Sequence, residues 1–127
     1  MLARAGHKVT LIGREAHMQA IANHGLQLDL ANSSSIENIR LETNTKVLAA
    51  KDADLILFCV KSTDSEVVAQ DIAAHLLPQA VVVSLQNGVE NSMLISRHIK
   101  NAVIPAVVYV ATEITAPGYV KHHGRGD

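Results

Sequence analysis

The sequence of 127 residues is poor in cysteine and in aromatic side chains. It contains one Cys, two Tyr, one Phe and no Trp. A single cysteine excludes an internal disulfide and fits a reducing compartment. The scarcity of aromatic rings argues against a protein that stacks nucleobases on its surface.

The sequence also lacks an excess of charge and a long apolar run. The 11 Lys and Arg nearly balance the 12 Asp and Glu, and no basic run occurs. Because phosphate binding needs clustered Lys and Arg, nucleic acid is excluded as an expected partner. No run reaches the length of a membrane span, and residues 1–7 do not resemble a signal peptide. We expect a cytoplasmic protein with no membrane partner and an undetermined oligomeric state.

The residues that are present alternate between apolar strands and amphipathic helices. This order predicts an α/β fold, a Rossmann-like doubly wound and mostly parallel sheet, in a single domain over residues 1–127. The segment Leu26–Glu42 reads as an antiparallel, hairpin-like insertion, with a polar turn at 31–38. Strands are expected at 8–13, 26–30, 39–42, 54–60, 81–83, 102–110 and 119–122, helices at 1–5, 15–23, 65–77 and 91–98, and a turn at 115–118.

The spacing of apolar residues also predicts which faces are buried. The continuous run 54–60 is typical of a strand buried on both faces. The apolar side of the first complete helix is expected at Ala16, Ala20 and Ile21. The apolar side of the next helix is expected at Val67, Val68, Ile72, Leu76 and Leu77, with Pro78 closing it.

The front of this fold is missing from the sequence. A doubly wound nucleotide-binding domain begins with a strand, a glycine-rich turn and a helix, but this sequence begins within that helix, which Gly6 ends. We therefore expect a fragment or a wrongly assigned start. The lost strand would be central and would leave two exposed strand edges. Residues 124–127 close no element, so a second domain is expected as well.

Three residues follow expected strands at the edge where a nucleotide would bind. Arg14 stands where an Arg suits the 2′-phosphate of NADP, although a surface Arg fits that position equally well. Lys61 follows the strand ending at Val60, and an ordinary solvated Lys is the alternative reading. Asn87 and Gly88 follow the next strand, where a plain strand-to-helix turn is the alternative.

No other residues form a convincing catalytic or metal-binding set. The seven His residues lack metal-ligand spacing, so we expect no metal site. Cys59 is expected to be a buried, inert thiol in the middle of a strand. Glu90 and Glu113 read as lone acids without partners. We assign no catalytic residue.

Four segments carry a resemblance over nearly the whole chain. They are 2–14 (LARAGHKVTLIGR), 53–61 (ADLILFCVK), 83–91 (VSLQNGVEN) and 116–126 (APGYVKHHGRG). Together they resemble the ketopantoate reductase (2-dehydropantoate 2-reductase) family, and the element Leu85-Gln86-Asn87-Gly88 within 83–91 is the most specific part.

The resemblance implies a function and a set of site residues. The family transfers hydride from NADPH to the ketone of ketopantoate, in the pathway to pantothenate and coenzyme A, so the resemblance implies a small-molecule substrate. It implies that Arg14 contacts the 2′-phosphate of NADP, that Lys61 lines the cofactor site, that Asn87 lies between nicotinamide and substrate, and that Ala111 offers a backbone contact.

The resemblance also implies what these 127 residues cannot do alone. The family's general-acid Lys and a substrate-binding Glu belong to a C-terminal helical domain that is absent here, as is the glycine-rich turn. We therefore expect a partial NADP-binding domain without reductase activity and with weak affinity for NADPH. A related NADP-dependent 2-oxo acid reductase, and a non-catalytic nucleotide-binding or interaction module, remain alternatives.

Overall fold

The computed structural model describes residues 2–29, 34–36, 39–43, 45, 53–88 and 90–123, with backbone only at 34–36. Most of the polar turn expected at 31–38, Val89 and the tail at 124–127 lie outside these residues. The chain divides into two compact units. Unit 1 comprises Met1–Asn44 and Tyr109–Asp127, and unit 2 comprises Thr45–Val108.

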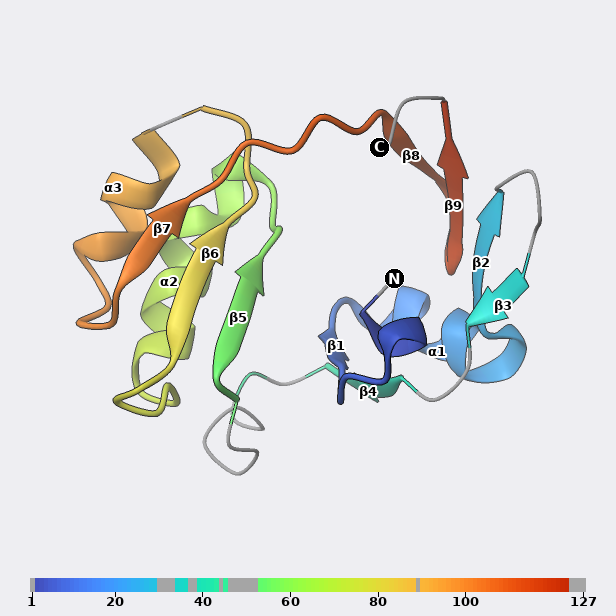
Figure 1. Ribbon diagram of the computed structural model, residues 1–127, viewed down its shortest axis with the longest axis horizontal. Coiled ribbons are helices and arrows are strands. Elements are labelled where there is room, and N and C mark those ends of the chain that lie inside the picture. The colour runs from blue at the N-terminus through green and yellow to red at the C-terminus, as the bar shows by residue number, and fades with distance from the viewer. Residues whose placement is uncertain are drawn as a thin grey trace. The chain divides into compact units, whose positions relative to one another are not determined.

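Unit 2 is built on a parallel sheet of three strands in the order β5-β6-β7. The strands run in the same direction in Figure 1, so their carboxyl ends meet at one edge of the sheet. A short 3-10 helix, η3, follows β5 and leads directly into α2. The bounds are β5 Leu55–Phe58, η3 Ser62–Asp64, α2 Ser65–Ala73, β6 Val81–Ser84, α3 Glu90–Ser96 and β7 Val103–Pro105.

The core of unit 2 lies on one face of this sheet. Phe58 and Val82 are buried there together with residues of α2 and α3. Alternate residues of β5 point to the opposite face. On that face, Leu55 and Leu57 are 51% and 41% exposed. The prediction of a strand buried on both faces is therefore wrong for β5, which pairs only with β6 at the edge of the described sheet.

Helix α2 is shorter than predicted, and of its expected apolar side Ile72 is buried but Val67 is not. It ends at Ala73 rather than at Leu77, and the His75 N–H bonds the Ile72 carbonyl in a tightened last turn. The buried residues are Ser65, Ala69 and Ile72, at helical spacing. Val67, expected in the core, is 68% exposed. Two small residues, Ser65 and Ala69, therefore share the buried side of this helix with Ile72.

The strand expected at 102–110 is confined to β7. It ends at Pro105, which cannot donate a backbone hydrogen bond to a ladder. Ala106 N–H still bonds the Ser84 carbonyl, but residues 107–110 are exposed and lie outside any strand.

Unit 1 contains a parallel pair, β1 with β4, and a sheet in the order β3-β2-β9-β8. The predicted helix end at Gly6 is confirmed as the left-handed cap of η1 (φ 87°). Helix α1 ends before Gly25, as predicted. The bounds are η1 Ala3–Ala5, β1 Thr10–Ile12, α1 Glu15–His24, β2 Leu26–Asp29, β3 Ser34–Ile36, β4 Arg40–Glu42, β8 Thr112–Ala116 and β9 Tyr119–His122.

The predicted hairpin between residues 26 and 42 is wrong in its second strand. The antiparallel partner of β2 is β3, with Leu26 opposite Ile36. Strand β4 instead pairs in parallel with β1, with Leu11 opposite Leu41. Parallel pairing needs a crossover connection, which α1, β2 and β3 provide. The alternating apolar and polar residues at 39–42 therefore predict a strand of the parallel pair and not of the hairpin.

In unit 1, the turn expected at residues 115–118 is also shorter than predicted. Strand β8 runs through Thr115 to Ala116, so the turn is limited to Pro117 and Gly118 before β9. Gly118 has a φ of 76°, and a Cβ there would lie 3.2 Å from Ala20 Cβ. On α1, Met18 and Ile21 are buried, whereas Ala16 is exposed.

The strand orders confirm the predicted fold class. The doubly wound order 3-2-1-4-5-6 contains one parallel pair and one parallel triplet flanking strand 1. The orders β4-β1 and β5-β6-β7 match that pair and that triplet. Strand 1 has no counterpart among the described strands. Each described helix falls short of the length and apolar character needed to cross a membrane.

Candidate functional site

Two turns meet at the carboxyl edge of the parallel sheet in unit 2. The first follows β5 and carries Lys61, which is exposed immediately before η3. The second follows β6 and carries Asn87 and Gly88, both exposed. Gly88 has a φ of 86°, a left-handed conformation that glycine adopts without strain. This edge is where open α/β sheets bind ligands, so the structure places Lys61 and Asn87 as the sequence predicted.

The Gln86 side chain ties the second turn to the first. Its Nε2 donates to the Val60 carbonyl oxygen (2.8 Å) and to Ser65 Oγ (2.6 Å). Its Oε1 accepts a hydrogen bond from Ser84 Oγ (3.1 Å). Ser65 and Ser84 are almost fully buried, so this amide satisfies hydroxyls that have little access to water.

Asn91, on the first turn of α3, makes a second tie. Its Nδ2 donates to the Asn87 carbonyl oxygen (2.8 Å) and to Ser62 Oγ (3.1 Å). Its Oδ1 accepts from Ser65 Oγ (3.3 Å). Sequence reasoning did not assign Gln86 or Asn91 a role. The available signal was two amide side chains flanking Asn87 and a serine-rich turn after β5.

The other two predicted residues lie in unit 1. Arg14 is the N-cap residue of α1, two positions after β1 ends at Ile12. Ala111 lies directly before β8, and its carbonyl oxygen accepts a hydrogen bond from the His123 N–H (2.8 Å). Unit 1 therefore carries Arg14 and Ala111, whereas unit 2 carries Lys61 and Asn87.

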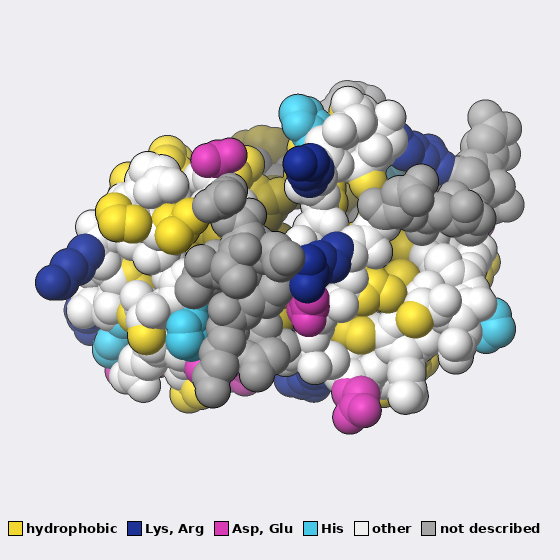
Figure 2. All heavy atoms as spheres, turned by 90° about the horizontal axis from the view of Figure 1, so that it is seen from below, with side chains coloured by type: hydrophobic (Ala, Val, Ile, Leu, Met, Phe, Trp, Pro, Cys, Tyr) yellow, Lys and Arg dark blue, Asp and Glu magenta, His cyan; other side chains and the backbone are white. Residues whose placement is uncertain are grey.

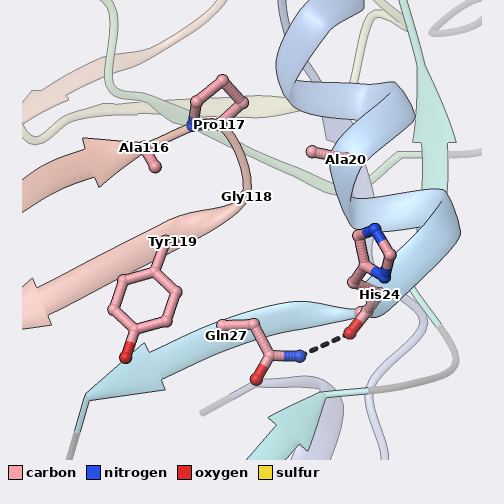
Figure 3. Close-up of a pocket in the computed structure, with 8 residues that line it drawn as sticks. Ala20, His24, Gln27, Ala116, Pro117, Gly118 and Tyr119 are labelled. Atoms are coloured by element: carbon pink, nitrogen blue, oxygen red, sulfur yellow. Dashed lines mark hydrogen bonds between the residues drawn. The ribbon is translucent and has the colours of Figure 1, made fainter.

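Unit 1 also contains a pocket that sequence reasoning did not predict. It has a volume of about 270 Å³ and contains none of the four predicted site residues. Figure 3 shows Ala20 and His24 of α1 on one side and the β8–β9 turn on the other, with the Gln27 side chain amide bonded to the His24 carbonyl oxygen. Its lining contains no Asp, Glu, Lys or Arg. The lining residues are Ala20, His24, Gly25, Gln27, Ala116, Pro117, Gly118 and Tyr119.

Two predictions about single side chains are wrong. Cys59 lies after the last residue of β5 and is exposed, not buried in mid-strand. The protein around it still raises the pKa of the thiol by desolvation, which disfavours the reactive thiolate. Glu113 was expected to lack a partner, but its Oε2 lies 3.0 Å from His123 Nε2.

The surface charges are mixed. On the face drawn in Figure 2, Lys and Arg side chains are scattered among Asp, Glu and His side chains. The described residues of that face therefore form no extended basic patch of the kind that holds a nucleic-acid backbone.

The carboxyl edge offers groups that can bind a polar or anionic ligand. Lys61 offers a cation to a phosphate or a carboxylate, and the Asn87 side chain can both donate and accept hydrogen bonds. The Gln86 and Asn91 amides are engaged in holding the turns. The arrangement can bind and orient a ligand.

Comparisons with known proteins identify the family. The model of the ketopantoate reductase PanE/ApbA family matches residues 1–127. A crystal structure of a PanE/ApbA family ketopantoate reductase from Ralstonia eutropha JMP134 is 45% identical, with a TM-score of 0.91, over 98% of this chain and 41% of that chain. A 2-dehydropantoate 2-reductase from Pyrococcus abyssi is 35% identical over 99% of this chain and 40% of its own length.

A third similar protein is D-mandelate dehydrogenase, solved with NADH and anilino(oxo)acetate. It is 26% identical, with a TM-score of 0.81, over 97% of this chain and 40% of that chain. The chain thus spans about 40% of the length of the curated relatives it matches. On the match over its full length, the chain belongs to the ketopantoate reductase PanE/ApbA family.

Proposed function

We propose that residues 1–127 form the NADP-binding part of a 2-dehydropantoate 2-reductase. The observation that carries the proposal is the pair of interlocked turns at the carboxyl edge of unit 2, in a chain of this family. These turns present Lys61 and Asn87 where an open α/β sheet holds its ligand.

Each predicted residue has a role in this proposal. NADPH, when bound, supplies the hydride for reduction of the ketone. Arg14 binds the 2′-phosphate through charge-assisted hydrogen bonds. Lys61 attracts the anionic cofactor, Asn87 orients nicotinamide and substrate with its amide, and Ala111 adds a backbone contact.

The test measures cofactor preference by isothermal titration of the 127-residue chain. We expect NADPH to bind more tightly than NADH. Arg14→Ala should weaken NADPH binding about 10- to 100-fold, because a hydrogen bond to a charged group contributes about 1.5–3 kcal/mol. NADH affinity should stay the same.

Arg4→Ala is the matched control, since Arg4 is also an exposed arginine of unit 1 and lies in η1. It should leave both affinities unchanged. Equal binding of NADPH and NADH, with no effect of Arg14→Ala, would refute the choice of NADP.

The same protein sample tests whether residues 1–127 can carry out the reduction by themselves. The resemblance assigns the general acid and a substrate-binding Glu to residues beyond these 127. We therefore expect the 127-residue chain to oxidise no NADPH when ketopantoate is added. Turnover above the rate without protein would contradict this assignment.

A second candidate is a related reductase that acts on another 2-oxo acid. The similarity to D-mandelate dehydrogenase in complex with NADH and anilino(oxo)acetate favours it. Preferential binding of NADH would support this candidate. Binding of neither cofactor would favour the third reading, a non-catalytic module. The single cysteine fits a reducing compartment, so we propose the cytoplasm as its location.

A further inference from the structure

We infer that Gln86 and Asn91 are positioning residues that hold the Lys61 turn and the Asn87 turn as one rigid unit. This inference rests on the proposed function for its link to NADPH. Its structural part, the coupling of the two turns, rests on the hydrogen bonds alone.

Each polar atom of the Gln86 amide makes a hydrogen bond at the junction of the two strands. Both of its N–H groups and its oxygen have partners, namely Val60 O, Ser65 Oγ and Ser84 Oγ. Two of these partners are hydroxyls that are 0% and 2% exposed. Removing the amide would leave the buried Ser84 hydroxyl without its acceptor and Ser65 Oγ with Asn91 alone. Leaving a buried polar group unsatisfied costs more free energy than losing a bond between exposed groups.

Asn91 acts at the outer end of the same junction. It contacts the Asn87 backbone on one side and Ser62, the residue after Lys61, on the other. Ser65 Oγ accepts from Gln86 and donates to Asn91, so the two amides belong to one connected network. Such networks fix geometry more than isolated bonds do.

The network leaves the side chains of Lys61 and Asn87 exposed while it fixes the backbone that carries them. Binding then requires less ordering of these turns, which improves affinity without a new contact to the ligand. Gln86 and Asn91 therefore act through their neighbours and need not touch the cofactor.

Asn91→Asp is the principal test variant. It keeps the oxygen that accepts from Ser65 but loses the N–H groups that bond Asn87 and Ser62. An Asp in the first turn of a helix is otherwise well tolerated. Gln86→Met removes the other amide with a similar shape. It is the harsher change because it removes the acceptor of the buried Ser84 hydroxyl and one of the two partners of the Ser65 hydroxyl.

Asn101→Asp is the matched control. The Asn101 amide donates to the carbonyl oxygens of Leu77 and Ala80, both at 2.8 Å, in the turn before β6. It is the same chemical loss in the same unit, but at the amino end of the strands, opposite to the candidate site.

The first readout is hydrogen exchange of backbone amides by NMR, in the 127-residue chain without ligand. Asn91→Asp should speed exchange about tenfold at Asp64 and Leu85, whose N–H groups bond Lys61 O and Phe58 O, and should spare Ala80. Asn101→Asp should speed exchange at Ala80 and should spare Asp64 and Leu85. Unchanged exchange at Asp64 and Leu85 in both Asn91→Asp and Gln86→Met would overturn the coupling of the turns.

The second readout is the Kd for NADPH together with the Tm. Asn91→Asp should raise the Kd about tenfold, whereas Asn101→Asp should lower the Tm at least as much without changing the Kd. An equal effect of both variants on the Kd would overturn the positioning role. If the wild-type chain binds no NADPH, the proposed function fails, and the exchange data alone still decide whether the turns are coupled.

Discussion

Gly118 shows how one residue fixes the approach of two elements in unit 1. Its backbone is left-handed, and a Cβ would crowd Ala20 on α1. We expect Gly118→Ala to lower the free energy of unfolding by about 2–3 kcal/mol, from the backbone conformation and the contact together. Gly6→Ala, where φ is 87° but a Cβ meets open space, should cost only about 1 kcal/mol. Urea unfolding followed by circular dichroism measures both, and equal losses would show that the contact is unimportant.

At the same scale, the sequence predicted the positions of the site residues better than the contacts that these residues make. Lys61 and Asn87 could be placed at the carboxyl edge because each directly follows an apolar strand. The bonds that Gln86 and Asn91 make to the turn after β5 could not be foreseen, because they join residues 21 to 29 positions apart in the chain. The partner of Glu113 was missed because β8 itself was not predicted.

At the scale of elements, α2 depends on small side chains. Ala69 is 0% exposed on the buried side of this helix, whereas Val67 is exposed. We expect Ala69→Leu to lower the free energy of unfolding by about 1–3 kcal/mol, because the larger side chain overpacks the core. Val67→Ala should change it by less than about 0.5 kcal/mol. Thermal unfolding of the two variants tests this, and a neutral Ala69→Leu would mean that the core around α2 is loosely packed.

The strands differ in how strongly their own residues predict a strand. The β-branched run of β6 and the apolar run of β5 are strong enough to be recognised from the sequence. Strand β3, with two Ser in three residues, and β8, with every residue exposed, carry no comparable pattern. Their pairing is set by β2 and β9, which lie elsewhere in the chain, so local composition could not reveal it.

At the scale of the whole molecule, apolar side chains remain at the surface of the parallel sheet. Leu57 of β5 and Ile104 of β7 both flank Val83 in the register, so they share a face, and they are 41% and 49% exposed. We expect the 127-residue chain to bind a hydrophobic dye and to self-associate as its concentration rises.

Leu57→Lys should reduce both dye fluorescence and light scattering, because it places a charge within this face. Val67→Lys is the control, since it adds the same charge at an exposed position on α2. If the two variants behave alike, net charge rather than the sheet face governs association.

The interleaving of the two units has a consequence for the order in which the protein takes shape during translation. Unit 2 is encoded without interruption, whereas unit 1 needs both ends of the chain. Gln27 of β2 can pair only after Tyr119 of β9, its partner in the register, has been synthesised. At about 5–20 residues per second, this delay is roughly 5 to 20 s, and the last residue of unit 2, Val108, is added roughly 0.5 to 2 s before Tyr119. The nascent chain thus completes the Lys61 and Asn87 turns before the sheet of unit 1 can close.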